Sequence, residues 1–327
     1  MSVFPDGLYQ YGGVPVGGGM LPVMGGDSKV FFVDPANGSD SNSGLKPSKA
    51  LDTIAAAYAK CTANMGDTVY LLGNGNTSGT AREAVPLTWG KDNTHLVGLG
   101  APCKMSQRTR ITPVSGVAAT NNPMFLLSAD ACVISNVAIQ HWGAGNGIVA
   151  EGMEVTGQRN YIHNCHIVGM TQTDVGDEAT ACDLLLSSGA NENTFKGCTF
   201  GVDTFVRTAA NANIMIKLNQ LVERNIFDDC LVVMRADADA PLVVDCASGS
   251  ITGFLLFKNC TFINNIEGTG TLLNEALDID NACGAPVILH NTMAYGFTEM
   301  CQADNGNVYV DGVGGAATGG LGIAATN

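Results

Sequence analysis

Hydrophobic segments recur along this chain, and each is interrupted at one point by a small polar residue or by glycine. In FLLFKNCTFINN, residues 254–265, Lys258 and Asn259 break what would otherwise be one apolar strand. Six such segments align on anchor residues that lie 28 to 33 positions apart: Val137, Cys165, Cys198, Cys230, Cys260 and Thr292. A regular period of this length predicts a solenoid, a propeller or another repeat array.

Each repeat is typical of two short strands on either side of its anchor. Phe, Ile or Leu stands three residues before every anchor, and five repeats carry Phe, Ile or Val two residues after it. A further strand-sized segment follows, such as CDLLLSS at 182–188 or PLVVDC at 241–246. Helical repeats need longer stretches with a 3.6-residue period, and a four-stranded propeller blade needs roughly 40 residues. We therefore predict an all-β fold, a right-handed parallel β-helix with two or three sheets per coil.

The residue just before each anchor is suited to a tight corner. Asn, Gly and Asp tolerate the left-handed backbone conformation, in which φ is positive, better than other residues do. We predict that one such residue turns the chain at the same corner of every coil. These structural corner residues are Asn136, Asn164, Gly197, Asp229, Asn259 and Asn291.

The anchors themselves are expected to point into the solenoid. Equivalent side chains of stacked coils lie about 4.8 Å apart, which predicts a buried core ladder formed by Cys165, Cys198, Cys230 and Cys260. Parallel Cβ vectors disfavour disulfides between them. The chain has 11 cysteines, an odd number, and its first basic residue is Lys29. We therefore expect reduced thiols and no secretory signal peptide.

The region before the repeats is expected to open the same solenoid. Strand-sized segments bounded by Gly or Pro continue through residues 51–115. A capping helix is predicted at about 48–63, with Ser48 as its N-cap, because the first coil of a solenoid exposes strand edges that need cover. The chain then divides into three parts: a Gly-rich arm at 1–28, a β-helix domain at 29–311 and a Gly-rich tail at 312–327.

The charge balance excludes several classes of partner. The 327 residues include 16 basic and 30 acidic side chains, for a net charge of −14. Nucleic acids and anionic membranes attract clustered Lys and Arg, and no apolar run approaches the length of a membrane span. We therefore expect neither a nucleic-acid partner nor a membrane.

Two stretches of the sequence resemble known proteins. FFVDPANGSDSNSGLKPSKALDTIAAAYAKCTANMGDTVYLL, residues 31–72, followed by coils with Asn at their corners, resembles the right-handed parallel β-helix proteins of the pectate-lyase-like superfamily. Within it, the opening FPDGLYQYGGVPV, residues 4–16, resembles that of phage-encoded virion proteins. The resemblance covers roughly residues 1–310 and implies a component of a phage head or tail.

The residues that pectin-active relatives use are largely missing. The polygalacturonase type implies Asn-Thr-Asp, Gly-Asp-Asp, Gly-His-Gly and Arg-x-Lys motifs, and the nearest match here is Asp228-Asp229, with Asp229 at a predicted corner. Arg207, Arg224 and Arg235 lie near acidic residues, an arrangement more typical of a solvated face than of a lyase site. We expect no catalytic residue.

No metal site is expected either. His163 and His166 flank Cys165, but with Ile162 and Cys165 inward both imidazoles should face outward, away from the thiol. The acidic loop 169–181 lacks the spacing of an EF-hand. We expect no metal ion and no other cofactor.

The alternative interpretation of the N-terminal arm is a flexible tail, but the arm is unusually apolar for one. An extended arm of 28 residues reaches up to about 90 Å, long enough to lie across neighbouring subunits. We interpret it as a docking arm, with contacts from Phe4, Leu8, Tyr9, Tyr11, Val14 and Val16.

Taken together, these features predict a structural protein of a tailed-bacteriophage virion that assembles in the host cytoplasm. The predicted role is that of a capsid decoration or cement protein, which docks as a homotrimer on the lattice of the major capsid protein or on other virion proteins. Two alternatives stay open: a tailspike-type depolymerase that cleaves host polysaccharide, and a carbohydrate-binding tail component without hydrolytic activity.

Overall fold

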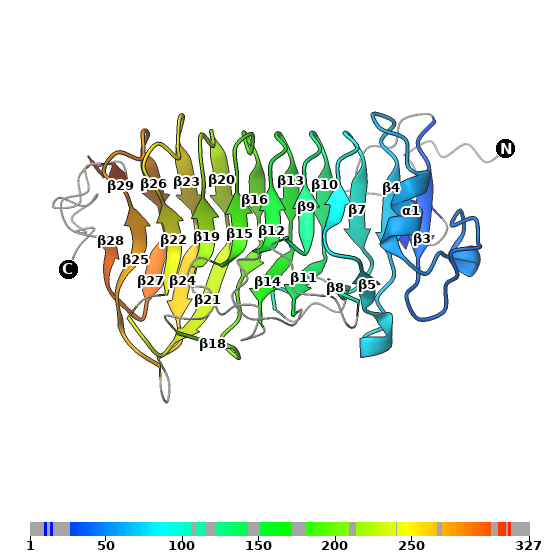
Figure 1. The fold of residues 1–327 in the computed structure, drawn as a ribbon, viewed down its shortest axis with the longest axis horizontal. Coiled ribbons are helices and arrows are strands. Elements are labelled where there is room, and N and C mark those ends of the chain that lie inside the picture. The colour runs from blue at the N-terminus through cyan, green and yellow to red at the C-terminus, as the bar shows by residue number, and fades with distance from the viewer. Residues whose placement is uncertain are drawn as a thin grey trace.

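The chain folds into a parallel β-helix whose three sheets run along its long axis (Figure 1). The computed structural model describes residues 27–101, 103–105, 109–114, 122–142, 151–171, 181–208, 214–239, 241–266, 270–301 and 307–311, and the backbone of 10, 11, 14, 15, 313 and 314. This confirms the predicted fold class.

Three sheets supply one strand each to a coil, in the order sheet 1, sheet 2, sheet 3. Sheet 1 contains β3 (Val30–Val33), β4 (Thr68–Leu71), β7 (His95–Gly98), β10 (Val133–Ser135), β13 (Tyr161–His163), β16 (Thr194–Lys196), β20 (Asn225–Asp228), β23 (Leu255–Lys258), β26 (Val287–His290), β29 (Val308–Val310) and β30 (Val313–Gly314). Sheet 2 contains β5 (Ala81–Glu83), β8 (Arg110–Pro113), β11 (Ala138–His141), β14 (His166–Met170), β17 (Thr199–Phe200), β21 (Leu231–Ala236), β24 (Thr261–Asn264) and β27 (Met293–Tyr295), with β18 (Val206–Arg207) beside β21. Sheet 3 contains β6 (Leu87–Trp89), β9 (Phe125–Leu127), β12 (Glu151–Val155), β15 (Cys182–Leu186), β19 (Ile214–Leu218), β22 (Leu242–Cys246), β25 (Leu273–Ile279) and β28 (Phe297–Cys301).

In-register pairing places identical side chains on top of one another in the interior. Phe195, Phe227 and Phe257 occupy matching positions of β16, β20 and β23, and their ring centroids are 4.7 and 4.8 Å apart. All three rings are fully buried, and burying a Phe stabilises a fold by about 1.5–3 kcal/mol. The hydrophobic period of the sequence therefore becomes a continuous core along the axis.

The capping helix is shorter than predicted. Helix α1 spans Ile54–Lys60, and Ser48 lies in a separate 3-10 helix, η1 (Pro47–Lys49). The helix begins late because Leu51 is extended: its N–H donates to the carbonyl of Phe32 and its carbonyl accepts from Asp34, along the free edge of β3. Thr53 is the N-cap and accepts a hydrogen bond from the amide of Ala56 at 3.1 Å.

Helix α1 closes the N-terminal end of the core (Figure 1). Ile54 and Ala57 are fully buried in the main hydrophobic cluster. The carboxylate of Glu83, on β5, accepts hydrogen bonds from the first amides of the helix, those of Ile54 at 2.6 Å and Ala55 at 3.3 Å. No helix in the described part of the chain is long and apolar enough to cross a membrane.

Two short strands precede the solenoid. β1 (Gln10–Tyr11) pairs antiparallel with β2 (Val14–Pro15), and Tyr11 lies opposite Val14. They form a hairpin with Gly12-Gly13 between the strands.

Glu83 is expected to make the stability of the capped end depend on pH. Burial raises the pKa of Glu83 to about 7, while the helix amides act in the opposite direction. A carboxyl whose folded pKa is raised contributes most stability below its unfolded pKa, and this contribution is lost as the pH rises through the folded pKa. We expect the advantage in melting temperature of the native chain over Glu83→Gln to shrink between pH 4.5 and 7.5, as measured by circular dichroism. The other titrating groups are common to both chains, so a constant difference would contradict the argument.

Candidate functional site

The predicted corner residues lie between sheet 1 and sheet 2. All six have positive φ, between 47° and 63°: Asn136, Asn164, Gly197, Asp229, Asn259 and Asn291. Two neighbouring pairs are linked by their side-chain amides, Asn164 to Asn136 at 3.3 Å and Asn291 to Asn259 at 2.9 Å. Their role is to turn the backbone.

The four predicted core cysteines are buried free thiols. Each Sγ donates to a carbonyl oxygen of the preceding coil: Cys165 to Ile134, Cys198 to Ile162, Cys230 to Phe195 and Cys260 to Phe227, at 3.3–3.5 Å. Burial raises the pKa of the Cys165, Cys198 and Cys230 thiols well above its ordinary value. They pack as small apolar groups.

A second polar ladder was missed by the sequence analysis. Asn160, Asn193 and Asn225 are buried at the corner between sheet 3 and sheet 1. The side-chain oxygen of Asn193 accepts from the amide of Asn160 at 2.9 Å, and that of Asn225 accepts from the amide of Asn193 at 3.0 Å. A signal was present, because all three precede their anchors by five residues.

The structure describes only some of the predicted docking-arm residues. Phe4, Leu8, Tyr9 and Val16 lie outside the described residues, and Tyr11 and Val14 are described as backbone within the β1–β2 hairpin. Their docking role stays a prediction.

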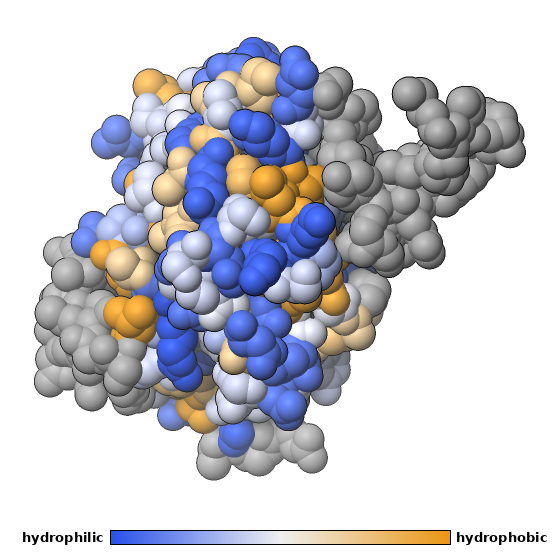
Figure 2. Space-filling view, turned by 90° about the vertical axis from the view of Figure 1, so that its right-hand side faces the viewer, coloured by the Kyte–Doolittle hydropathy of each residue, from blue (hydrophilic) through white to orange (hydrophobic). Residues whose placement is uncertain are grey.

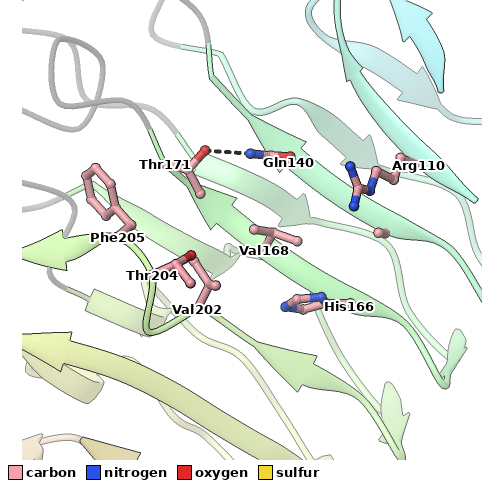
Figure 3. Close-up of a pocket in the computed structure, with 9 residues that line it drawn as sticks. Arg110, Gln140, His166, Val168, Thr171, Val202, Thr204 and Phe205 are labelled. Carbon is pink, nitrogen blue, oxygen red and sulfur yellow. Dashed lines mark hydrogen bonds between the residues drawn. The ribbon is translucent and has the colours of Figure 1, made fainter. Parts of the chain in front are cut away.

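A pocket of about 350 Å³ opens on the outer face of sheet 2. Its floor is formed by outward side chains of β8, β11 and β14, and its wall by the segment 202–205 that follows β17 (Figure 3). The lining residues are Arg110, Ala138, Gln140, His166, Val168, Thr171, Val202, Thr204 and Phe205. Arg110, Ala138 and His166 stand in one row across the three strands, and the small side chain of Ala138 leaves the hollow between the two larger ones.

A β-bulge shapes the floor of this pocket. Ile139 pairs with Ile167, but Gln140 pairs with Gly169, so Val168 is an extra residue in β14. Bulges redirect side chains, and here Val168 lines the pocket while Thr171 accepts a 2.8 Å hydrogen bond from the amide of Gln140.

The wall is anchored by a buried ion pair. Arg207, on β18, contacts Asp183 on β15 at 2.9 Å, and both side chains are fully buried. Asp183 also accepts from the amide of Met170 at 3.2 Å, and the Arg207 guanidinium lies 5.8 Å from the ring centroid of Phe205. The interpretation of Arg207 as part of a solvated face was wrong, because a partner 24 residues away draws it into the interior.

His166 faces outward from the core, as expected, but it is buried under the same wall. Its Nε2 lies 2.9 Å from the carbonyl oxygen of Gly201. Burial lowers the pKa of His166, so the ring is neutral at pH 7. Because a carbonyl only accepts, Nε2 carries the proton. His163 is half-buried and stacks on Tyr161, with ring centroids 5.8 Å apart.

The lining chemistry suits binding better than bond cleavage. Arg110 supplies a positive charge, Gln140, Thr171 and Thr204 supply hydrogen-bonding groups, and Phe205 supplies an apolar surface. None of the nine lining residues is a carboxylate, whereas glycoside hydrolysis usually needs two. Among the described residues, no cluster of three or more His, Cys, Asp or Glu is arranged to hold a metal ion.

Comparison with known proteins identifies the fold and nothing finer. No family profile and no curated protein sequence matches the chain. The pectate lyase Pel9A superposes with a TM-score of 0.50 at 12% identity, covering 88% of this chain and 80% of that one. The pectin methylesterase PemA from Erwinia chrysanthemi gives 0.49 at 14% identity, covering 85% and 83%. ORF18 of Geobacillus virus E2 gives 0.46 at 13%, covering 76% of this chain and 50% of that one. The architecture is therefore that of the pectate-lyase-like right-handed β-helix.

Gly169 should be indispensable to the pocket. It has a φ of 73°, and a Cβ added there would overlap the carboxylate of Asp183. Gly249 is a matched control, because its φ is 69° and an added Cβ meets nothing within 4 Å. Alanine at either position carries the left-handed cost of about 1–2 kcal/mol. We expect Gly169→Ala to lower the free energy of unfolding in urea by at least about 2 kcal/mol more than Gly249→Ala. Equal losses of unfolding free energy in the two variants would show that the position of the Asp183 carboxylate does not require the absence of a side chain at residue 169.

Proposed function

We propose that this chain is a non-catalytic structural protein of a tailed-phage virion, a capsid decoration or cement protein that docks as a homotrimer on the major capsid protein lattice. The observation that carries the proposal is a difference between two parts of the chain. The described solenoid builds a core of its own, closed at one end by α1, while a strongly apolar segment precedes it.

The arm supports this role by its composition and its resemblance. Residues 4–16 resemble the opening of phage virion proteins. One arm that buries three aromatic and several aliphatic side chains contributes only several kcal/mol at about 25 cal/mol per Å², before ordering costs of about 1–2 kcal/mol per residue. Three arms in a trimer bind through effective concentration, so trimerisation turns a weak contact into firm attachment.

The pocket weighs against a depolymerase. It offers no carboxylate among its lining residues. Asp183, the nearest buried acid behind the wall, is paired with Arg207 and has no exposed side-chain surface. An acid that cannot reach a substrate cannot protonate a leaving group.

Removing the arm tests the docking proposal. Deletion of residues 1–26 should leave the circular dichroism of the β-helix unchanged, since β3 begins at Val30, and should abolish co-sedimentation with undecorated phage heads. Deletion of residues 315–327 is the matched control. Equal co-sedimentation of the full-length and arm-deleted chains would place the docking surface on the solenoid, and failure of the full-length chain to bind heads would overturn the virion role.

A second candidate function, carbohydrate binding without hydrolysis, is favoured by the pocket. A cation, an amide, hydroxyls and one aromatic ring converge there, which suits a sugar that carries a carboxylate. We expect Arg110→Ala to weaken binding of acidic oligosaccharides such as oligogalacturonate at least tenfold in calorimetry, with Lys196→Ala on sheet 1 as the control. Absence of heat with the native chain, or equal affinity of both variants, would remove this candidate.

A further inference from the structure

One row of outward side chains on sheet 1 changes character along the axis. The paired positions run Phe32, Tyr70, Val97, Ser135, His163, Lys196, Asp228, Lys258 and His290, from β3 to β26. The first three are apolar and the last five are charged or titratable. Along this row, the outer face of sheet 1 therefore changes from apolar near the N-terminal end to charged farther along the axis.

The apolar part of this face forms a cluster separate from the main core, which we call the outer apolar patch. It comprises Val30, Phe32, Ala50, Tyr70 and Val97, with Leu72 and Leu99 packed against it. Figure 2, which looks at the N-terminal end, shows a mostly hydrophilic surface with one group of apolar side chains, whereas the five central members of the patch are themselves buried. An apolar cluster on the outer face of a sheet is stabilised only where another layer removes it from water, so it marks a contact surface.

The patch must have a covering layer. Phe32, Tyr70 and Val97 are only 1%, 3% and 4% exposed, yet they stand side by side on one face and cannot bury one another from above. Apart from Ala50, every described apolar member lies on β3, β4 or β7 or directly follows β4 or β7. The described apolar members of the patch thus supply the lower layer, and Ala50 alone among them comes from outside these strands and their ends.

Residues 1–26 are the segment whose position and composition fit the upper layer. They lead through residues 27–29 into Val30, which is itself part of the patch. Twelve of them are large apolar residues: Met1, Val3, Phe4, Leu8, Tyr9, Tyr11, Val14, Val16, Met20, Leu21, Val23 and Met24. The β1–β2 hairpin lies within this segment, and an isolated two-stranded hairpin is marginally stable in water, so its pairing also calls for a surface beneath it.

We propose that residues 1–26 pack over the outer apolar patch of their own chain, with the β1–β2 hairpin as the contacting element. This intramolecular contact has a high effective concentration, since only the linker 16–29 separates the hairpin from β3. The inference does not depend on the proposed function. If the chain does dock on a virion, a hairpin held on the solenoid by one face is preorganised to present its other face to the lattice, which lowers the entropic cost of docking.

Limited proteolysis of the full-length chain tests this contact. Chymotrypsin has sites after Tyr9 and Tyr11, and the rate of cleavage there, followed by mass spectrometry, reports the release of the arm. We expect slow cleavage in the native chain and at least tenfold faster cleavage in Val97→Asp, which places a charge in the patch. Ile226→Asp is the matched control, because Ile226 also points outward from sheet 1, on β20 beyond the patch, and its rate should equal the native one.

A second variant keeps the proposal testable if Val97→Asp fails to fold. Tyr11→Asp changes the hairpin alone and removes the cleavage site at Tyr11. It should raise both the rate of cleavage after Tyr9 and the binding of an apolar dye, with an unchanged melting curve for the solenoid. Rapid cleavage in the native chain, or equal rates in Val97→Asp and Ile226→Asp, would overturn the proposal. Protection that falls on about a hundredfold dilution would overturn the intramolecular contact and assign the patch to the arm of a second copy.

Discussion

The solenoid depends on one backbone requirement, a residue with positive φ where sheet 1 turns into sheet 2. Asn136, Asn164, Gly197, Asp229, Asn259 and Asn291 all meet it. A left-handed residue turns the chain in a single step, so the apolar residues two before and one after the corner both reach the interior. Repetition of the same turn keeps successive coils in register. The stacked phenylalanines and the buried thiols follow from that register.

The pocket on sheet 2 lies where the regular stacking of the coils is interrupted. The bulge at Val168, the excursion at 202–205 and the buried pair of Asp183 and Arg207 all fall within neighbouring coils. A buried ion pair is weak evidence for stability, because desolvation offsets the attraction between its charges. Its role here is geometric: it holds the wall against β14 through the amide of Met170.

The sequence was sufficient for the fold and insufficient for the pocket, for physical reasons. Corner residues and apolar positions repeat with the coil, so the period reveals them before any contact is known. The start of α1 was misplaced because the extended backbone of Leu51 is set by its pairing with β3, a contact between segments. Arg110 and His166 are 56 residues apart in sequence and share a row only through the registers of two strand pairs. Arg207 was interpreted as solvated because nothing local indicates its partner. The second ladder could have been predicted from the sequence, since Asn160, Asn193 and Asn225 have a constant spacing from their anchors.

The direction of the strands has a mechanical consequence. Strands lie across the long axis in all three sheets (Figure 1), so the hydrogen bonds between coils run along that axis. Tension applied from end to end would load these bonds one coil at a time and peel the solenoid from its free end, because each coil contacts only its neighbours. Force applied across the axis would instead be resisted by covalent backbone within each coil. The molecule therefore resists force across its long axis better than tension along it. It is better suited to bear load while lying lengthwise on a surface than to connect two bodies that are pulled apart.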